Sequence, residues 1–557
     1  MKTIITLFIM SLCVSFSFAQ TKPKLVLQIT VDQLRGDMPF SIQDRWTEGG
    51  FKYLLDSGVW YANAHHPHAN TETIVGHITL STGAYPSSHG MISNAWFDYE
   101  EDRLVYNIED NAYDATGGKS SRDQASEVDH SQVSKSEGRS PHNILTTTFS
   151  DEMASAYGPQ SKIFAVSGKD RGAVSMAGHN GKAFWYSTKD GAFTSSTFYY
   201  DEFPKWVSKW NGNKKADQYK NDFWKLMNDI KTYRFGEEDD RPFENPEDIG
   251  YGKVFPHPYG DSKYYYTLLM ASPVVDELTV DFAKQLIVEE NIGQDDVTDY
   301  LSISLSSTDY IGHLFGPNSL ESEDNLIRLD QNLANLFQFI DQKVGLENTL
   351  IVLSSDHGAP ESAQSLKAKG FPVDVLDISQ LDLTEIDLKL KKQFGIGKEV
   401  IKLNYVPYVY LDRKLIKEKG LDLGEVSKVI AEELTRIDGI AYAYTSTDVA
   451  MGNLADTPIT RRVLNNYHPK RSGDIYIINE PNWSFTVNGD IALVNHGSPW
   501  SYDTSVPVVF VGNHLEKKMV YSEISTIDIA ITLSKYLKIL EPSGAEGQPL
   551  EEVLNTQ

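Results

Sequence analysis

The chain has 557 residues, 40% of them hydrophobic, and a formal net charge of −26 at pH 7. This length allows a large buried core, so the protein need not be a small scaffold that depends on disulfides. The strongly negative charge disfavours nucleic acid and anionic membrane surfaces as partners, because both would be repelled.

Residues 1–19 are predicted to be a secretory signal peptide. Lys2 precedes an apolar stretch at residues 4–14, and Ala19 offers a small side chain at a cleavage point. The apolar stretch is shorter than the roughly 20 residues of a membrane helix, so stable membrane insertion is not expected. Cys13 is the chain's only cysteine, and the bulky residues before it argue against a lipid anchor. We therefore expect a periplasmic or secreted protein without disulfides.

The first strand is expected at residues 25–31, and Asp32 follows it directly. After a short helix near residues 51–55, Thr73 is predicted to open another helix. Unpaired backbone N–H groups and the positive end of the helix dipole favour an oxyanion at such a position. An N-cap role is the ordinary explanation for a threonine there. Asn94 and a cationic loop farther along favour a catalytic role instead.

That cationic loop follows a predicted strand at residues 163–166 and contains Lys169 and Arg171 on either side of Asp170. In an acidic chain, an anionic substrate has to be attracted by a local positive field, and these two cations can supply it. Surface salt bridges with neighbours such as Asp170 are the alternative.

Two long segments are expected to be insertions into one core. The segment at about 175–295 is rich in aromatic residues, which fits either a lid over the substrate or the core of the insertion. Its acidic stretch at residues 237–240 is expected to be a solvated loop rather than a Ca²⁺ site. The segment at about 359–488 has its own helical period between Val426 and Ile437.

Six residues of metal-ligand type are spread along the chain. They are Asp32, Asp309, His313, Asp356, His357 and His496. Predicted strands at residues 300–305 and 349–355 precede the middle four. Carboxylates and imidazoles that converge from separate strand ends suit Zn²⁺, since three protein ligands leave a coordination position open for chemistry. The sequence therefore indicates a metal hydrolase.

The remaining elements complete an alternation of strands and helices. A long helix is expected at residues 321–344, a strand at 506–512 and a closing helix at 524–537. This pattern indicates an α/β sandwich with a mostly parallel central sheet and helices on both faces, in which functional residues collect at the carboxyl ends of the strands. Because the ligands must meet, residues 20–557 are read as a single catalytic domain. Its core is expected at about 20–174, 296–358 and 489–557.

The motifs resemble those of the alkaline phosphatase superfamily. They are Asp32, Thr73-x-x-x-His77, Asp309-x-x-x-His313, Asp356-His357-Gly358 and His496-Gly497, in that order along the mature chain. With Asn94 and the loop containing Lys169 and Arg171, the chain is similar to the phosphate-irrepressible, broad-specificity monoesterase branch (PafA-like).

This resemblance implies an exported alkaline phosphatase that uses two zinc ions to hydrolyse small phosphate monoesters. It implies one ion held by Asp32, Asp356, His357 and the oxygen of Thr73, and another held by Asp309, His313 and His496. Thr73 would be the nucleophile and form a phosphothreonine, and Asn94, Lys169 and Arg171 would bind the phosphate. His77 and His89 are expected to be structural, and His65, His66 and His68 a surface or turn cluster rather than a third metal site.

Several other functions compete with this one. A nucleotide pyrophosphatase or phosphodiesterase of the same superfamily would share Thr73 and the six ligands, and only Asn94, Lys169 and Arg171 separate it from a monoesterase. A sulfatase is disfavoured because the chain lacks a Cys/Ser-x-Pro-x-Arg segment. A manganese phosphoglycerate mutase would be cytosolic and use a serine, and a non-catalytic metal-binding protein would need no nucleophile. The physiological ester and the oligomeric state stay open.

Overall fold

The computed structural model describes residues 22–118, 130–241, 244, 250–260, 264–487 and 493–555. The predicted signal peptide, with Cys13, lies outside the described residues. Among the residues that are described, no helix combines the length and the apolar character needed to cross a membrane.

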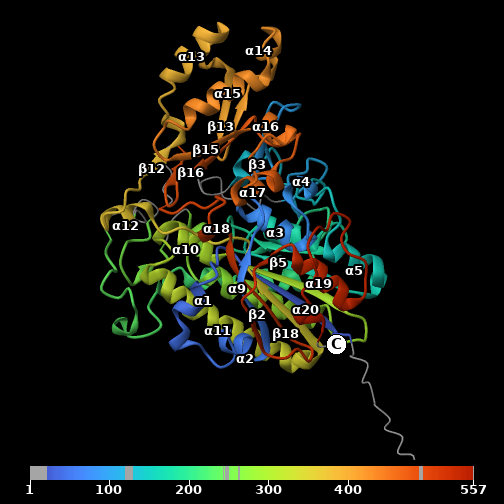
Figure 1. Ribbon diagram of the computed structural model, residues 1–557. Coiled ribbons are helices and arrows are strands. Elements are labelled where there is room, and N and C mark those ends of the chain that lie inside the picture. Colours follow the sequence, from blue (N-terminus) through green and yellow to red (C-terminus); the bar gives the residue numbers. More distant parts are fainter. Residues whose placement is uncertain are drawn as a thin grey trace, which may run out of the picture.

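A ten-stranded sheet forms the centre of the molecule (Figure 1). Its strands, in spatial order, are β19 (Lys518–Val520), β2 (Gly58–His65), β18 (Ser505–Gly512), β11 (Thr349–Ser354), β1 (Leu25–Val31), β10 (Asp299–Leu305), β5 (Ile163–Ser167), β6 (Lys182–Tyr186) and β7 (Phe193–Thr194), with β20 (Ile524–Ser525) paired to β2. The run from β11 through β1, β10 and β5 to β6 is parallel throughout, while β18 and β7 pair antiparallel to their neighbours. The predicted mostly parallel sheet is confirmed.

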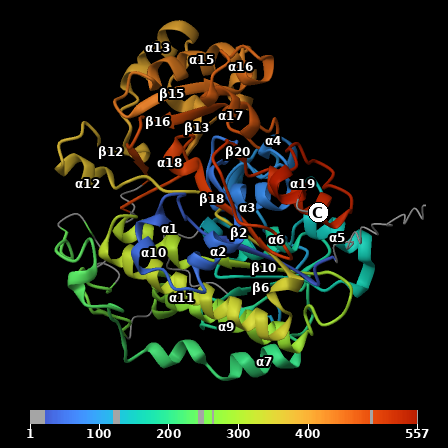
Figure 2. The same ribbon diagram turned by 60° about the horizontal axis from the view of Figure 1, so that its bottom comes forward.

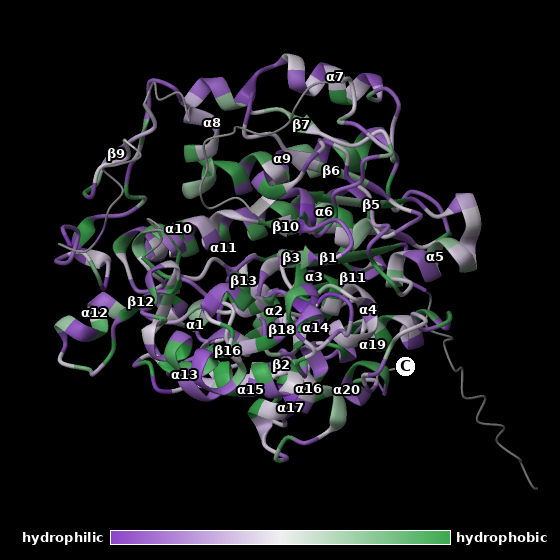
Figure 3. Ribbon diagram, turned by 90° about the horizontal axis from the view of Figure 1, so that it is seen from above, coloured by the Kyte–Doolittle hydropathy of each residue, from purple (hydrophilic) through white to green (hydrophobic). Residues whose placement is uncertain are grey.

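Helices cover both faces of this sheet because alternate strand residues point to opposite sides. Leu27 and Ile29 of β1 pack into one apolar cluster, whereas Val26 packs into another. The first cluster includes residues of α2 (Phe51–Ser57), α9 (Val274–Glu289) and α11 (Leu320–Lys343), and the second includes residues of α5 (Phe149–Tyr157) and α19 (Asp528–Leu537). Figure 2 shows α9 and α11 along the lower side of the sheet. Figure 3 shows hydrophobic segments gathered around the central strands.

Most elements begin and end close to where the sequence pattern places them. The strands expected at residues 25–31, 163–166, 300–305 and 349–355 correspond to β1, β5, β10 and β11, and the helix expected at 321–344 corresponds to α11. The closing helix is shorter than predicted and begins at Asp528. Ile524 and Ser525 pair with β2 instead, and the backbone N–H of Thr526 donates to His65 O, so the chain is extended there.

A second, antiparallel sheet lies within the second expected insertion. Its strands are β13 (Ile401–Tyr405), β14 (Tyr408–Leu411), β16 (Ile475–Asn479) and β15 (Ile440–Thr445), and it is accompanied by α13 (Thr384–Phe394), α14 (Arg413–Glu418) and α15 (Leu423–Leu434). These elements share their own apolar cluster. Coloured orange, they lie above the central sheet in Figures 1 and 2.

The first expected insertion differs from its predicted boundary. β6 and β7 lie inside the range 175–295, yet they continue the central sheet. We therefore propose that this insertion begins after β7. Its aromatic residues pack as a core against β7: the ring of Phe282 stacks on that of Phe193 with centroids 4.3 Å apart, and Trp210 meets Phe282 edge-on.

Helix α3 (Thr73–Thr82) lies directly against the loop that follows β11. A Cβ atom added to Gly76 would be 1.9 Å from the carbonyl oxygen of Asp356 and 2.6 Å from its carbonyl carbon. Both are backbone atoms, so no side-chain rotation can relieve the overlap. A residue without a side chain is therefore what allows the helix that carries Thr73 to approach Asp356.

Gly76→Ala is expected to lower stability and activity together, by about 1–3 kcal/mol or more in the free energy of unfolding, because the helix must move away from Asp356. Gly212→Ala, at the end of α7 (Lys205–Gly212), is the matched control, since an added Cβ meets nothing within 4 Å. Urea unfolding and turnover would be measured on both variants. A Gly76→Ala protein that matches the wild type in both would contradict this close contact.

Candidate active site

The structure brings the six predicted ligands together in two triads. One contains Asp32, Asp356 and His357, and the other contains Asp309, His313 and His496. Within each triad, one ligand atom from every residue lies within 4.8 Å of the others. The six residues are spread between positions 32 and 496 of the chain, and the fold brings them together at the carboxyl ends of the central strands.

Local structure explains where each ligand lies. Asp32 follows β1, and Asp356 and His357 follow the parallel neighbour β11. Asp309 and His313 lie one turn apart on α10 (Ser307–Phe315), so both side chains project from the same helix face. His496 comes from the loop before α18 (Ser501–Thr504) rather than from a strand end.

Backbone carbonyls orient all three histidine ligands. Nδ1 lies 2.6 Å from Val494 O in His313, 2.9 Å from Gly358 O in His357, and 2.8 Å from Thr71 O in His496. A carbonyl oxygen only accepts hydrogen bonds, so Nδ1 carries the proton in each ring and donates it. The Nε2 lone pair is then available as a metal ligand, as is usual for metal-binding histidines.

The spacing of the ligand atoms fits tetrahedral zinc. Nε2 of His357 is 3.3 Å from Asp32 Oδ1, and Nε2 of His313 is 3.2 Å from Asp309 Oδ1. Ligands on a zinc ion with bonds of about 2 Å would be about 3.3 Å apart at tetrahedral geometry. Oδ1 of Asp32, Oδ2 of Asp356 and Nε2 of His357 are buried, and no hydrogen bond is formed at these three atoms among the described residues. The residues present therefore fit the two ions that the motifs imply.

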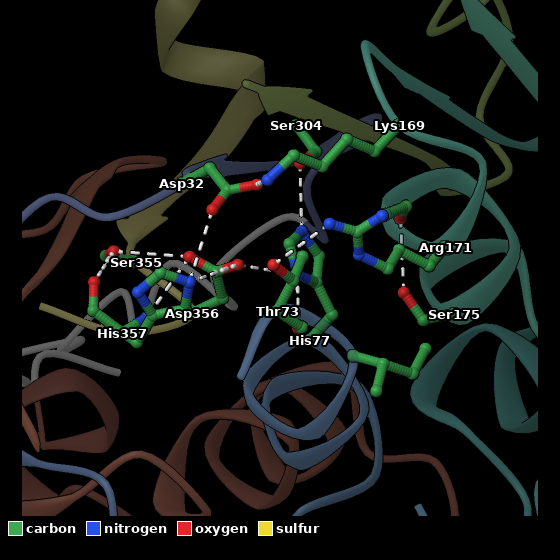
Figure 4. Close-up of polar contacts among 12 residues, drawn as sticks. Asp32, Thr73, His77, Lys169, Arg171, Ser175, Ser304, Ser355, Asp356 and His357 are labelled. Atoms are coloured by element: carbon green, nitrogen blue, oxygen red, sulfur yellow. Dashed lines mark hydrogen bonds and ion pairs between the residues drawn. The ribbon is translucent and has the colours of Figure 1, made fainter. Parts of the chain in front are cut away.

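Thr73 is the first residue of α3 and is only 1% exposed. Glu72, not Thr73, occupies the N-cap position. The Nη2 atom of Arg171 lies 3.5 Å from Thr73 Oγ1, and Figure 4 shows the guanidinium pointing at this hydroxyl. The backbone of Thr73 is also fixed, since its carbonyl lies 2.9 Å from Nδ1 of His77. The hydroxyl, the cation and the helix end therefore meet at one point.

Lys169 lies between the two triads. Its Nζ is 2.7 Å from Asp32 Oδ2 and 2.5 Å from Asp309 Oδ2, and Figure 4 shows the first of these ion pairs. Burial alone would lower the pKa of Lys169, but Asp309 and Asp32 outweigh it and raise that pKa above its usual value. Burial would likewise raise the pKa of Asp32, yet Lys169 and His357 hold it below its usual range.

The alternative of surface salt bridges for this loop does not match the structure. Lys169 and Arg171 are each only 4% exposed. The carboxylate of Asp170 instead pairs with Arg139, whose Nε lies 2.7 Å away, and accepts a hydrogen bond from the hydroxyl of Tyr106. Asp170 therefore anchors the start of α6 (Asp170–Ala177), and both cations of the loop are directed into the site.

Asn94 is held by a residue that the sequence analysis did not identify. Glu72 accepts hydrogen bonds from the hydroxyl of Ser93, at 2.9 Å, and from the backbone N–H of Asn94. The side-chain oxygen of Asn94 accepts from the backbone N–H of Ile74 at 3.2 Å, so its amide nitrogen can serve as a donor. Burial raises the pKa of Glu72, opposed by the hydrogen bonds from Asn94 and Ser93. The only sequence signal for Glu72 was its place directly before Thr73.

The other histidines show one error of prediction. His66 and His68 are fully buried in the irregular segment that follows β2, so of the predicted surface or turn cluster the surface location is wrong for both. The end of β2 passes beneath the Asp356 loop, where His66 bonds to Ser355 O at 3.0 Å. Neither residue belongs to a metal-ligand group among the described parts of the chain. His77 lies 2.9 Å from Ser304 Oγ, a contact that fits the structural role expected of it.

A cleft of about 500 Å³ opens above Thr73. The core supplies its floor, including Thr73, Arg171 and His496, and the second insertion supplies an outer wall that includes Trp483 and Phe485. The described lining contains none of the aromatic residues that suggested a lid in the first insertion, so that interpretation is wrong. The sequence analysis did not anticipate the wall, because nothing local indicates which insertion folds over the site.

Comparisons with known proteins were made with this geometry in view. The sequence profile of the type I phosphodiesterase / nucleotide pyrophosphatase family matches residues 26–499. The chain is 35% identical to alkaline phosphatase PafA of Elizabethkingia meningoseptica, over 96% of this chain and 95% of that protein. It is 33% identical to alkaline phosphatase PhoV of Synechococcus elongatus, over 96% and 94% respectively.

Solved structures give the same result. A crystal structure of wild-type alkaline phosphatase PafA has a TM-score of 0.85 at 34% identity and covers 95% of this chain and 99% of its own. Murine ectonucleotide pyrophosphatase / phosphodiesterase 5 is more distant, with a TM-score of 0.52 at 14% identity, over 93% of this chain and 95% of its own. That second likeness shows a shared fold alone.

Proposed function

The chain belongs to the alkaline phosphatase superfamily, within the type I phosphodiesterase / nucleotide pyrophosphatase family, and we propose that it is an exported, zinc-dependent phosphate monoester hydrolase that acts through a phosphothreonine. The alkaline phosphatases PafA and PhoV match it at about 35% identity over nearly the whole chain, which makes it a phosphomonoesterase. The observation that carries the rest is the position of Thr73 Oγ1, beside Arg171 and two triads of metal ligands. Export rests on the sequence of residues 1–19.

The ligands divide between two ions. Asp32, Asp356, His357 and the oxygen of Thr73 would hold one zinc ion, and Asp309, His313 and His496 would hold the other. When bound, zinc lowers the pKa of a hydroxyl and stabilises negative charge on a departing oxygen.

The chain's own groups perform two displacements at phosphorus. The Thr73 hydroxyl gives its proton to solvent and its oxygen attacks phosphorus; the bond to the ester oxygen breaks, and that oxygen takes a proton from water and leaves as the alcohol while phosphothreonine forms. Water then attacks the same phosphorus from the vacated side and loses a proton to solvent; the bond to Thr73 breaks, the Thr73 oxygen regains a proton, and inorganic phosphate is released. Arg171 can grip two non-bridging oxygens in a bidentate manner, and Asn94 can donate a further hydrogen bond. The first turn of α3 adds backbone N–H groups for the developing charge.

Charge favours monoesters over diesters. Two Zn²⁺ ions formally balance the three aspartates and a Thr73 alkoxide, and Lys169 and Arg171 then bring the site to about +2. The carboxylate of Glu72 lowers this to about +1 when it is ionised. A positive site has reason to prefer a dianionic monoester to a monoanionic diester. The phosphodiesterase alternative shares the ligands and the nucleophile, and it is disfavoured by two buried cations, Arg171 beside Thr73 and Lys169 between the two triads.

Metal content provides the first test. The purified protein is expected to carry about two zinc ions per chain, and Asp309→Ala and Asp356→Ala should each lose metal and activity, because each removes one of three protein ligands. Asp296→Ala, whose side chain is fully exposed, is the control. Elemental analysis would accompany assays with p-nitrophenyl phosphate. Full activity with one ion or none would rule out the two-ion site.

The nucleophile is tested at Thr73. Thr73→Ser should retain substantial turnover because a hydroxyl remains, whereas Thr73→Ala should fall by orders of magnitude because the covalent route is lost. Acid quenching during turnover, followed by peptide mapping, should find phosphate on Thr73. Phosphate on a different residue, or an unimpaired alanine variant, would refute the assignment.

Specificity is tested at the two cations. Lys169→Ala/Arg171→Ala should lower kcat/KM for a monoester far more than for a matched diester, each lost charge-assisted contact costing about 1.5–3 kcal/mol. Because Lys169 also pairs with Asp32 and Asp309, zinc content has to be measured on the same samples, and Arg171→Ala alone is the cleaner variant. Equal losses on both substrates would bring the phosphodiesterase alternative forward.

A further inference from the structure

The cleft above Thr73 is charged at its floor and uncharged at its outer wall. The acidic and basic side chains among the described lining residues are Glu72, Arg171, Asp309, His313, His496 and Asp503, all from the core. The second insertion supplies the outer wall, and none of the described lining residues that it contributes is charged. Tyr405, Val406, Trp483, Phe485 and Val487 give this wall its apolar surface; we call these five residues the apolar wall.

Hydrogen bonds hold the apolar wall next to the second triad. Phe485 lies on β17 (Ser484–Thr486), and its carbonyl accepts from Nδ2 of Asn495 at 2.9 Å. Asn495 directly precedes His496, and the neighbouring Val494 carbonyl receives the Nδ1 proton of His313 at 2.6 Å. One short segment therefore connects Phe485 to both histidines of that triad.

A second set of bonds ties the rest of the wall to the core. Nε1 of Trp500 donates to Asn479 O at 2.9 Å, and the backbone N–H of Asn482 donates to the hydroxyl of Tyr502 at 3.0 Å. Trp483 follows directly in the chain. The apolar wall is thus fastened to the same loop that carries His496, and it faces the site as a fixed surface.

The position of the apolar wall beside the second triad determines which part of a bound substrate would contact it. In the proposed reaction the ester oxygen departs beside Asp309, His313 and His496, so the alcohol group of the substrate projects from that triad toward Phe485. The wall offers accessible apolar surface there, with Val487 41% exposed and Val406, Trp483 and Phe485 partly exposed. An apolar alcohol would bury this surface favourably. A second anionic group would lose water without gaining a cation.

We propose that the apolar wall is a leaving-group subsite that selects phosphate monoesters of alkyl or aryl alcohols over esters whose alcohol carries a further anionic group. The inference rests on the proposed function, because it takes the ester oxygen to depart beside His313 and His496. Phosphate recognition at the floor and alcohol recognition at the wall then come from different parts of the chain.

A series of straight-chain alkyl phosphates from methyl to hexyl tests the subsite. The alcohols of this series ionise almost equally, so changes in kcat/KM report binding of the chain rather than reactivity of the ester. We expect kcat/KM to rise about two- to four-fold for each added methylene that lies on the wall, and at least about ten-fold from methyl to hexyl. The hexyl chain ended by a carboxylate, 6-(phosphonooxy)hexanoate, should lose most of that gain.

Variants locate the effect. Trp483→Ala and Phe485→Ala should each shrink the hexyl-to-methyl ratio of kcat/KM toward one, and using this ratio cancels any change in metal content or folded fraction. Phe371→Ala is the matched control, because Phe371 is 55% exposed and outside the described lining of the cleft; it should keep the wild-type ratio.

The outcomes separate the two proposals. A flat series, a carboxylate-ended ester as good as hexyl phosphate, or wall variants with the wild-type ratio would overturn the subsite while turnover itself upheld the phosphatase. No hydrolysis of any ester, methyl and p-nitrophenyl phosphate included, by zinc-loaded protein would overturn the proposed function and the subsite with it.

Discussion

Three carboxylates are buried at the carboxyl ends of neighbouring strands in the central sheet, and the rest of the site has to supply positive charge for them. Asp32 and Asp356 are fully buried and Asp309 is 3% exposed, and buried negative charge is stable only with positive charge close by. Lys169 supplies one such charge by lying within ion-pair distance of Asp32 and Asp309. Burial would lower the pKa of His357, but Asp356 and Asp32 raise it to about 9. The same need for positive charge makes the two triads suited to divalent cations.

The candidate metal ligands are positioned mainly by backbone groups. Three neighbouring parallel strands deliver the aspartates or the helix that carries them, and main-chain carbonyls orient each histidine ligand. The N-terminus of α10 is fixed through its backbone as well, although by a side chain, since the carboxylate of Asp276 accepts hydrogen bonds from the N–H groups of Ser306 and Ser307 at 2.8 and 3.0 Å. Backbone contacts of this kind leave little freedom, which suits a site whose ligands must match bond lengths to within a few tenths of an ångström.

The two insertions differ in their relation to the chemistry. The first contributes aromatic residues that pack under the sheet as additional core, whereas the second places its own small domain over the cleft. The core therefore supplies the floor of the cleft with the candidate metal ligands, and the second insertion supplies the wall proposed to bind the alcohol. Such a division lets specificity change without disturbing the metal ligands.

Local sequence patterns were enough to predict the six candidate ligands, the candidate nucleophile and most of the helices and strands that carry them. Buried parallel strands such as β1 and β11 are continuous apolar runs that end at a charged residue, and α11 repeats its apolar positions along one face, so each can be recognised from neighbours in the chain. Thr73 could be proposed as an anion-binding position because a helix start has the same electrostatic character in any protein.

Which residues far apart in the chain come into contact depends on the tertiary structure. Strand order and the packing of loops bring Lys169 next to Asp32 and Asp309, and Glu72 next to Asn94. They also bury His66 and His68 and place β6 and β7 in the central sheet. The same holds for the position of the wall above Thr73, because Thr73 and Tyr405 are more than three hundred positions apart in the chain. The spacing of apolar residues indicates which side of a helix or strand is buried. It does not indicate which other segment packs there, because the same apolar face can pack against many different segments.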